Sequence, residues 1–395
     1  MRTRHLIAAL AVLLPLPPGA AQAGIDKAGT TAANFLTIGA DAAVLGMGGA
    51  AVGVTGDLGA AAWNPAALGS MERLQVLFAH ADLSNQDRQE WASVGGPGAA
   101  LGIHWALNGL FQNDGGIDGR DVSNNPTGTF GTSSSAFGLQ LARPLGSHFA
   151  AGLGVKYVNE RLAGVSGTGA TFDAGLSMRS GMVGVGVVAQ NALGRMNYDS
   201  AIYPFPSSVG CGVSLTDPGR GLRVALDANV PTAYYPDIRG GIEWLWKGSF
   251  ALRAGYRAEL GAAPGDPLAG PTFGMGAGVS GFWFDYGYLM AGGGNGQHRL
   301  GLSFHPGGPE AGTGATGGST APPRQPSASG DRETRRPTST ATSPPERPTK
   351  IVVAKGETLE IIARRWKTSV SALMMLNNLM RPEVRPGQVL LLPEK

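Results

Sequence analysis

Residues 73–304 alternate with a period of two: large apolar side chains take one parity, and glycine or polar residues take the other. The clearest run is residues 170–179, in which Phe172 and Leu176 share one face while Asp173 lies on the opposite face. Successive side chains of a β-strand point to opposite faces of a sheet, so a period of two indicates strands. The pattern predicts a chain that is mainly β.

About 14 strands can be placed from this alternation, and the connections between them alternate between long and tight. An even number of strands with this arrangement is typical of outer-membrane barrels. Long connections are expected at residues 108–134, 191–206 and 258–270, and tight ones at 143–147, 180–181, 247–248 and 281. Strands are expected to begin near Arg73, Gln89, Ala99, Ser135, His148, Gly169, Met182, Ser207, Gly221, Asp237, Ser249, Pro271, Phe282 and Gln297.

A soluble β-sandwich would alternate too, but aromatic residues at both ends of the apolar face favour a membrane. Phe149 and Tyr157 are eight positions apart, which is roughly 26 Å along a strand and about 19 Å of height at a tilt of about 45°. This spacing approaches the height of a lipid-facing band. We therefore predict a transmembrane antiparallel β-barrel over residues 73–305, of about 14 strands.

The first 23 residues indicate export. Met1 to Arg4 is a short basic segment, residues 6–16 are apolar, and Ala21-Gln22-Ala23 is a small-x-small cleavage site. A short membrane anchor is the alternative, but the apolar run is too short to span roughly 30 Å of hydrocarbon. The single cysteine, Cys211, cannot form an internal disulfide and is expected to act as a small apolar residue on the outward parity.

Composition changes this picture in one respect. Glycine supplies 63 of 395 residues, more than twice the average usage of roughly 7%. Ten of these glycines occupy the inward parity, where small residues would leave space in the barrel lumen for a plug: Gly152, Gly154, Gly175, Gly184, Gly186, Gly210, Gly212, Gly274, Gly276 and Gly278. Enlarging Gly276 is expected to disturb the plug.

Charged residues also occur on the inward parity: Asp173, Arg179, Arg223, Asp227, Arg239, Glu243, Arg253, Arg257 and Asp285. Two interpretations are open. The charges could line a substrate path, or they could form a ladder of paired lumen charges that steadies the barrel. The net charge of the whole chain, +3, is too small to predict nucleic-acid binding.

Residues 24–72, before the barrel, are small, apolar and rich in glycine, and are predicted to be the plug. Asn64 is a good N-cap and Pro65 a good first helical residue, so a short helix is expected to begin there. The segment carries a motif made of Gly46, Gly48, Gly49, Asp57, Trp63, Asn64 and Pro65.

This segment resembles the opening of PorV/PorQ family outer-membrane proteins, which belong with the FadL-like transporters. The resemblance rests on Phe35-Leu36-x-Ile38-Gly39-x-Asp41-Ala42, Gly46-Met47-Gly48-Gly49-Ala50, Asp57 and Trp63-Asn64-Pro65-Ala66, and extends to His298-Arg299-x-Gly301-Leu302-Ser303-Phe304. It implies a fourteen-stranded barrel whose N-terminal segment plugs the lumen. Unlike this chain, family members usually end at the terminal aromatic residue.

Residues 306–349 are dominated by Pro, Ser, Thr and Gly and cannot bury enough apolar surface to fold. A flexible coil of roughly 40 residues spans on the order of 35 Å, and about 130 Å when fully extended. The segment is predicted to be a tether, with a glycosylated stalk as the alternative.

Residues 350–395 regain the pattern of a folded module: strand, helix, helix, strand. They resemble a LysM domain through Val353-x-x-Gly356-Glu357-Thr358-Leu359-x-x-Ile362-Ala363, Leu373-x-x-x-Asn377 and Pro386-Gly387-Gln388-x-Leu390-x-Leu392-Pro393. The resemblance implies binding of peptidoglycan or a related N-acetylglucosamine-containing glycan. Carried over to this chain, the groove would consist of Gly356, Glu357, Thr358 and Leu359 facing Asn378, Leu379, Met380 and Arg381. Trp366 and Leu373 are expected in the core.

Two functions follow as hypotheses, and a third class, an enzyme, is weighed against them. The first is an outer-membrane barrel tethered to peptidoglycan by a periplasmic LysM domain, with the PorV/PorQ-like role in type IX secretion, and hence secretion components or secreted cargo as partners. The alternative is FadL-like transport of hydrophobic molecules across the outer membrane. An enzyme is not expected, because the six histidines show no metal-ligand spacing and no G-x-S-x-G motif occurs. No cofactor or metal is predicted.

Overall fold

The computed structural model describes residues 29–83, 87–98, 102–261, 269–291 and 296–306, together with parts of residues 350–392. The predicted signal peptide and residues 307–349 of the predicted linker lie outside the described residues. The chain divides into two compact units, residues 1–319 and 320–395. Among the described residues, no helix is long and apolar enough to cross a membrane.

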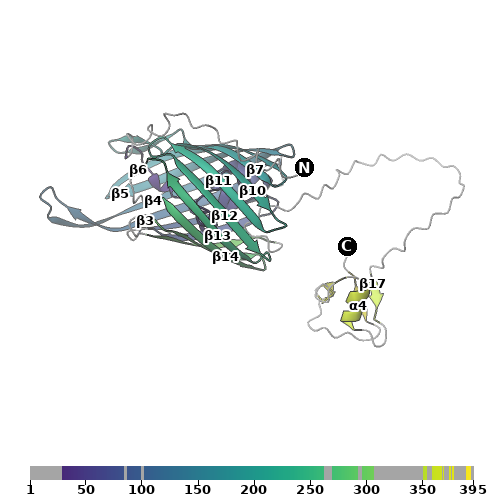
Figure 1. Cartoon of the computed structure of the whole chain (residues 1–395). Coiled ribbons are helices and arrows are strands. Elements are labelled where there is room, and N and C mark those ends of the chain that lie inside the picture. Colours follow the sequence, from purple (N-terminus) through teal and green to yellow (C-terminus); the bar gives the residue numbers. More distant parts are fainter. Residues whose placement is uncertain are drawn as a thin grey trace. The chain divides into compact units, whose positions relative to one another are not determined.

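The first unit is a closed antiparallel β-barrel of 14 strands (Figure 1). Each strand pairs with its neighbour along the chain, and β1 pairs with β16 to close the wall. The predicted strand number and antiparallel arrangement are confirmed. The wall strands are β1 (Gln75–Asp82), β2 (Arg88–Pro97), β3 (His104–Arg120), β4 (Pro126–Leu145), β5 (Phe149–Leu162), β6 (Val165–Ser180), β7 (Val183–Ala192), β10 (Ser208–Asp217), β11 (Leu222–Pro231), β12 (Asp237–Trp246), β13 (Phe250–Glu259), β14 (Gly270–Val279), β15 (Phe282–Leu289) and β16 (Gln297–Phe304).

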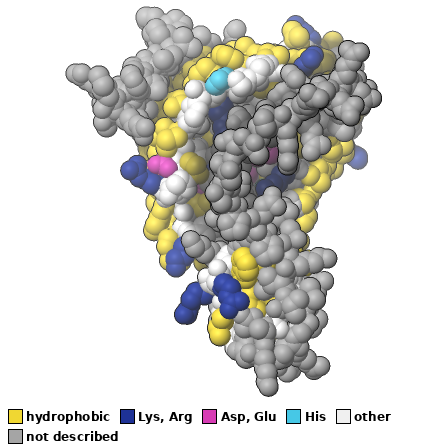
Figure 2. Space-filling view, turned by 90° about the vertical axis from the view of Figure 1, so that its right-hand side faces the viewer, with side chains coloured by type: hydrophobic (Ala, Val, Ile, Leu, Met, Phe, Trp, Pro, Cys, Tyr) yellow, Lys and Arg dark blue, Asp and Glu magenta, His cyan; other side chains and the backbone are white. Residues whose placement is uncertain are grey.

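The alternation along each strand separates an apolar outer face from a buried inner face. On β6, Phe172 and Leu176 are 45% and 55% exposed, whereas Asp173 between them is 2% exposed. Aromatic Phe149 and Tyr157 are likewise exposed on the outer face of β5. Figure 2, which views the end of the barrel opposite the β3–β4 extension, shows hydrophobic side chains following the rim. The predicted outward and inward parities are confirmed on these strands.

The two ends of the barrel differ in their connections. The turn end holds the start of β1, the end of β16 and short turns such as Gly181–Met182 and Lys247–Ser249. The opposite end, called the loop end, holds the connection between β7 and β10, which carries a small hairpin of β8 (Arg195–Tyr198) and β9 (Ile202–Pro204) attached to β6. The sequence predicted a long connection here, at residues 191–206, without the hairpin.

A second connection differs more from its prediction. The expected long loop at 108–134 is mostly strand, because β3 and β4 pair from His104 and Ala142 out to Arg120 and Pro126. The barrel wall ends at Asn113 on β3, the last residue of that strand that pairs with β2, and at Thr132 on β4, which is the outermost residue that pairs with β5. Beyond them β3 and β4 form a two-stranded ribbon that projects from the loop end (Figure 1). The polar, glycine-rich sequence lacks apolar alternation there. Backbone pairing maintains the ribbon, and the Thr132 hydroxyl, which donates to the Asp114 carboxylate, adds a side-chain bond between the two strands.

Residues 29–72, called the plug, lie inside the barrel as four short helices. These are η2 (Asn34–Thr37), α2 (Ala42–Gly46), α3 (Leu58–Ala61) and η3 (Pro65–Ser70). Carboxylate and amide side chains begin three of them: Asp41 caps α2, Asp57 caps α3 and Asn64 caps η3. The helix predicted at Asn64-Pro65 is confirmed, as a 3₁₀ helix with Pro65 in its first turn. The plug begins near the loop end, where the Ala32 N–H donates to the Pro204 carbonyl, and ends at the turn end, beside β1.

The second unit contains β17 (Lys350–Val352), α4 (Leu359–Arg365) and β18 (Val389–Leu391), with β17 and β18 paired antiparallel. Its core includes Leu359, Ile362, Leu373 and Leu390, all fully buried, and Trp366 packs against them. The Asn377 amide donates to the Leu391 carbonyl and accepts from the Leu391 N–H, at 3.0 and 2.7 Å, which joins the second helical segment to β18.

Candidate functional site

The wall glycines allow the plug backbone to approach the barrel closely. A Cβ on Gly186 would lie 1.9 Å from the Val52 carbonyl oxygen, and one on Gly175 would lie 2.0 Å from Asn64 Oδ1. Either distance is far shorter than an ordinary contact. The prediction that inward glycines leave space for the plug is correct at these positions and also at Gly152, Gly184, Gly212 and Gly274.

Gly276 is an exception. A Cβ there would meet Asp285 Oδ1 at 2.4 Å and Arg253 Nη1 at 3.1 Å, and these atoms belong to the wall. The expectation that a leucine at Gly276 disturbs the plug stays a prediction. The first atoms it would meet belong to charged side chains of the wall, and one of them, Arg253, lies against Gly46 of the plug. Gly154 and Gly278 similarly face wall side chains, those of Asp173 and Trp283.

Polar side chains of the wall bind the plug backbone. Asp227 Oδ2 accepts the N–H groups of Ala51 and Val52, at 2.6 and 2.8 Å. Thr272 Oγ1 accepts the Gly48 N–H and donates to the Gly46 carbonyl. Four other wall side chains donate to plug carbonyls: Gln140 to Ala61, Ser177 to Ala66, Ser214 to Gly53 and Arg299 to Ile38. The plug backbone is thus satisfied by inward wall groups, as buried peptide groups require.

The motif residues of the plug are placed at these close contacts. Cα atoms of Gly46 and Gly274 face each other so closely that a Cβ on Gly46 would lie 2.9 Å from the second. Gly48 has φ +72° and lies against Gly240 and Tyr256, so it is the residue at which both the backbone conformation and the space demand glycine. Asn64 is fully buried, and its amide donates to the Val52 and Leu176 carbonyls.

The inward charges form a paired network across β11–β15 and a separate pair on β5 and β6. Arg253 contacts Glu243 and Asp285, each at 2.7 Å, and Arg223 lies 3.8 Å from Glu243. Asp237 contacts both Arg239 and Arg257, Arg257 also contacts Glu259, and Lys156 contacts Asp173. The paired-ladder interpretation holds for these residues. Asp227 departs from it because it holds the plug, and Arg179 is a partly exposed residue at the end of β6.

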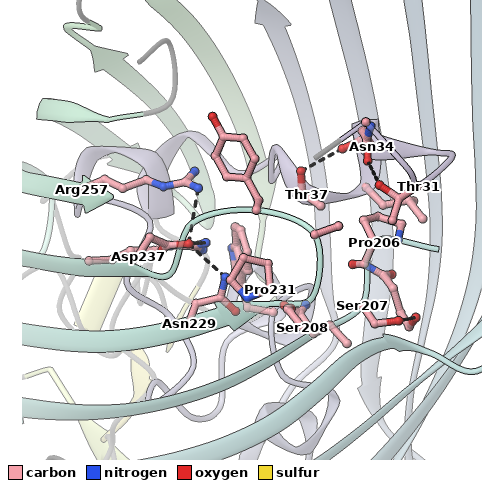
Figure 3. A pocket seen from close by; sticks show the side chains of 18 residues that line it. Thr31, Asn34, Thr37, Pro206, Ser207, Ser208, Asn229, Pro231, Asp237 and Arg257 are labelled. Carbon is pink, nitrogen blue, oxygen red and sulfur yellow. Dashed lines mark hydrogen bonds and ion pairs between the residues drawn. The ribbon is translucent and has the colours of Figure 1, made fainter. Parts of the chain in front are cut away.

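An outer chamber of about 260 Å³ lies between the plug and the loop-end parts of β7, β10, β11 and β12. Figure 3 shows it from close by, with Thr31, Asn34 and Thr37 of the plug on one side and Asp237, Asn229 and Arg257 of the wall on the other. The Asn229 amide donates to Asp237, which Arg239 and Arg257 also contact. The lining is mixed: these polar groups lie beside an apolar surface made by Leu36, Trp63, Pro206 and Pro231.

An inner chamber of about 80 Å³ adjoins it. Leu36, Trp63 and Gln190 line both chambers. The rest of the inner lining is mainly apolar and includes Trp91, Leu110 and Ala136. Sequence reasoning did not find either chamber, since their residues come from the plug and from many separate strands. The signals that pointed toward them are Trp63 of the plug motif and two of the inward charges, Arg239 and Arg257, which line the outer chamber.

The predicted glycan groove is described only in part. Gly356, Glu357, Asn378, Leu379, Met380 and Arg381 lie outside the described residues. Thr358 is exposed immediately before α4, whereas the Leu359 side chain is fully buried in the core and is available to a ligand only through its backbone. Among the described residues, no group of three or more His, Cys, Asp or Glu side chains could hold a metal ion.

Residues 351–393 match the family model of the LysM domain. No curated protein matches the chain. Among solved structures, the barrel is similar to the toluene transporter TodX of Pseudomonas putida, with 12% identity, a TM-score of 0.50, and coverage of 68% of this chain and 98% of that chain. The toluene transporter TbuX of Ralstonia pickettii (11% identity, 69% and 98% coverage, TM-score 0.47) and a Pseudomonas aeruginosa FadL homologue (11%, 67% and 98%, 0.46) are also similar. At such identities the likeness to TodX shows a common barrel fold and nothing further.

Proposed function

We propose that this protein is an outer-membrane barrel tethered to peptidoglycan by its LysM domain in the periplasm. The observation that carries the proposal is the LysM match at residues 351–393, which follows a barrel whose outer face is apolar. β1 begins and β16 ends at the turn end, and short turns of this kind face the periplasm in outer-membrane barrels. A chain leaving Phe304 would then enter the compartment that contains the cell wall.

Co-sedimentation with purified peptidoglycan sacculi tests the tether. Full-length protein in detergent should sediment with sacculi, and a truncation after residue 306 should stay in the supernatant. Thr358→Val removes an exposed hydroxyl from the proposed groove and should weaken binding, whereas Arg364→Gln, at an exposed position on α4, is the matched control. Equal sedimentation of full-length and truncated protein would refute the proposal.

A second function is favoured by the two chambers: passage of small hydrophobic molecules from the loop end into the lumen. A plugged lumen with adjoining cavities suits a ligand that binds before it crosses, and binding sites are commonly concave with a few polar groups. Cells that express the barrel should accumulate a radiolabelled uncharged amphiphile, 1-decanol, faster than cells without it. The truncation after residue 306 should retain this activity, which separates transport from tethering. Unchanged accumulation would argue against transport.

The type IX secretion role rests on the resemblance of the plug motif to the PorV/PorQ family and stays a prediction. Affinity purification of the tagged full-length protein from its native cells provides the test. Recovery of secretion components or exported cargo with the barrel would support the role. Their absence, together with normal secretion in a deletion strain, would contradict it.

A further inference from the structure

Trp63 is the residue at which the chambers in the lumen meet. It lines the outer chamber, the inner chamber and a third, much smaller space beside Arg299. It belongs to the plug segment between α3 and η3, and its side chain is 9% exposed. Its indole ring, with Leu36 and Gln190, therefore separates the outer chamber from the inner one.

The ring is held by contacts on two sides. The Arg239 guanidinium lies 4.5 Å from the ring centroid, a cation–π distance. On another side Gly39 leaves room for the ring, since a Cβ at that position would be 2.5 Å from a ring carbon. The neighbouring Asn64 is fixed by its buried hydrogen bonds. The indole is thus positioned by both the wall and the plug.

The charged groups of the outer chamber are already compensated. Asp237 is contacted by Arg239 and Arg257, and Arg257 is also contacted by Glu259, so two guanidinium groups face two carboxylates. An anionic ligand would have to compete with carboxylates that lie within the same buried network, which is unfavourable in a poorly solvated site. The side chains of Asn34, Ser207 and Asn229 hydrogen-bond within the protein, to Thr31, Asn191 and Asp237 respectively. An amide or hydroxyl group can make more than one such bond, so these three residues suit a neutral polar group.

The size of the inner chamber limits what it can accept. Its volume of about 80 Å³ is smaller than the cavity of roughly 150 Å³ that holds a benzene molecule in another protein. It suits a short alkyl end and is too small for an aromatic ring. Together, the two chambers reach the lower part of the range of small-molecule sites, about 300–1,000 Å³.

Building on the proposed transport function, we propose that the two chambers form one site for uncharged amphiphiles and that Trp63 sets the chain length it accepts. The polar end occupies the outer chamber, the first part of the alkyl chain passes the indole, and the chain end fills the inner chamber. Trp63 acts here as a specificity-determining residue, and Arg239 positions it.

Equilibrium dialysis of the full-length protein in lipid nanodiscs tests this, with empty nanodiscs as background. The probes are radiolabelled 1-alkanols from hexanol to hexadecanol, and decanoate at pH 8. For the wild type, affinity should rise with chain length and then fall once the inner chamber is full, and decanoate should bind at least tenfold more weakly than 1-decanol. Trp63→Ala should shift the optimum to longer alkanols, and Trp63→Phe should shift it less.

Trp91→Ala is the matched control, because Trp91 lines the inner chamber but not the outer one. It should accept a bulkier chain end while leaving the preference for an uncharged head unchanged. An unchanged length profile in both Trp63 variants, or equal affinity for decanoate and 1-decanol, would overturn the inference. Binding of none of the probes by the wild type would instead refute the transport function itself. Heat-modifiable migration on gels confirms that each variant forms a barrel.

Discussion

Adding one methyl group at Gly186 should detach the middle of the plug from the wall. The new Cβ would lie 1.9 Å from the Val52 carbonyl oxygen, and real contacts of this kind are essentially never below 3.0 Å, so the carbonyl has to move by more than 1 Å. The same carbonyl accepts a hydrogen bond of 3.1 Å from the Asn64 amide, which the movement would break.

The magnitude follows from these two effects. Overpacking of a well-packed site costs about 1–3 kcal/mol, and a lost hydrogen bond costs about 1 kcal/mol. Weakening of plug docking by about 2–4 kcal/mol corresponds to an increase on the order of 30- to 700-fold in the population of the undocked plug.

Hydrogen exchange measured by mass spectrometry is the assay. The amides of Ala51 and Val52, which donate to Asp227, should exchange faster by that factor in Gly186→Ala than in the wild type. Gly154→Ala is the control: it is also an inward wall glycine, but its Cβ would make ordinary contacts of 3.4 Å with Asp173 and Gln140. Equal exchange in Gly186→Ala and Gly154→Ala would refute the view that these glycines exist to admit the plug.

Three further outcomes are expected. Arg253→Leu leaves Glu243 and Asp285 buried without their shared cation and should destabilise the barrel by about 3–5 kcal/mol. The loss should appear as a lower unfolding temperature in heat-modifiable gel migration. Arg220→Leu, which removes an exposed ion pair, should change the unfolding temperature little. Burial, reinforced by the Asp57 and Asp285 carboxylates, raises the pKa of Asp41 in the plug from 3.8 to about 7. Because the docked plug then holds the proton more tightly than the undocked plug, docking should weaken as the pH rises from about 4 to about 7, and Asp41→Asn should flatten this dependence in exchange measured against pH. Asn377→Ala removes both bonds to Leu391 and should lower the melting temperature of the LysM unit without changing that of the barrel, as followed by calorimetry of the full chain.

The strands of the barrel could be predicted because each has an apolar outer face and an inner face toward the lumen. That difference recurs at every second residue. The same rule failed at residues 114–131, where the β3–β4 ribbon has similar surroundings on both faces and its sequence shows no alternation. Pairing there depends on backbone hydrogen bonds and on a polar contact between Thr132 and Asp114, neither of which apolar alternation reports.

The candidate site was less accessible to sequence reasoning. Caps such as Asn64 are local and were predicted, but a partner such as Asp227 is 175 positions from Val52. The alternation along β11 correctly predicted that Asp227 points into the lumen. It could not tell whether such a carboxylate pairs with an arginine or, as here, accepts hydrogen bonds from two backbone N–H groups. The same limit hid the chambers, whose lining residues meet only after the sheet has closed.

The docking of the plug also constrains the order of assembly. Its hydrogen bonds join residues separated by 127 positions for Ala33 and Glu160, and by 261 for Ile38 and Arg299. The plug is the earlier part of the chain, yet its partners on β14 and β16 are synthesised long after it. Contacts of such long range form slowly. Two orders of assembly are then open: the sheet closes around a plug already within it, or the plug enters a finished barrel. Only in the second order is an unplugged barrel with an open lumen an intermediate.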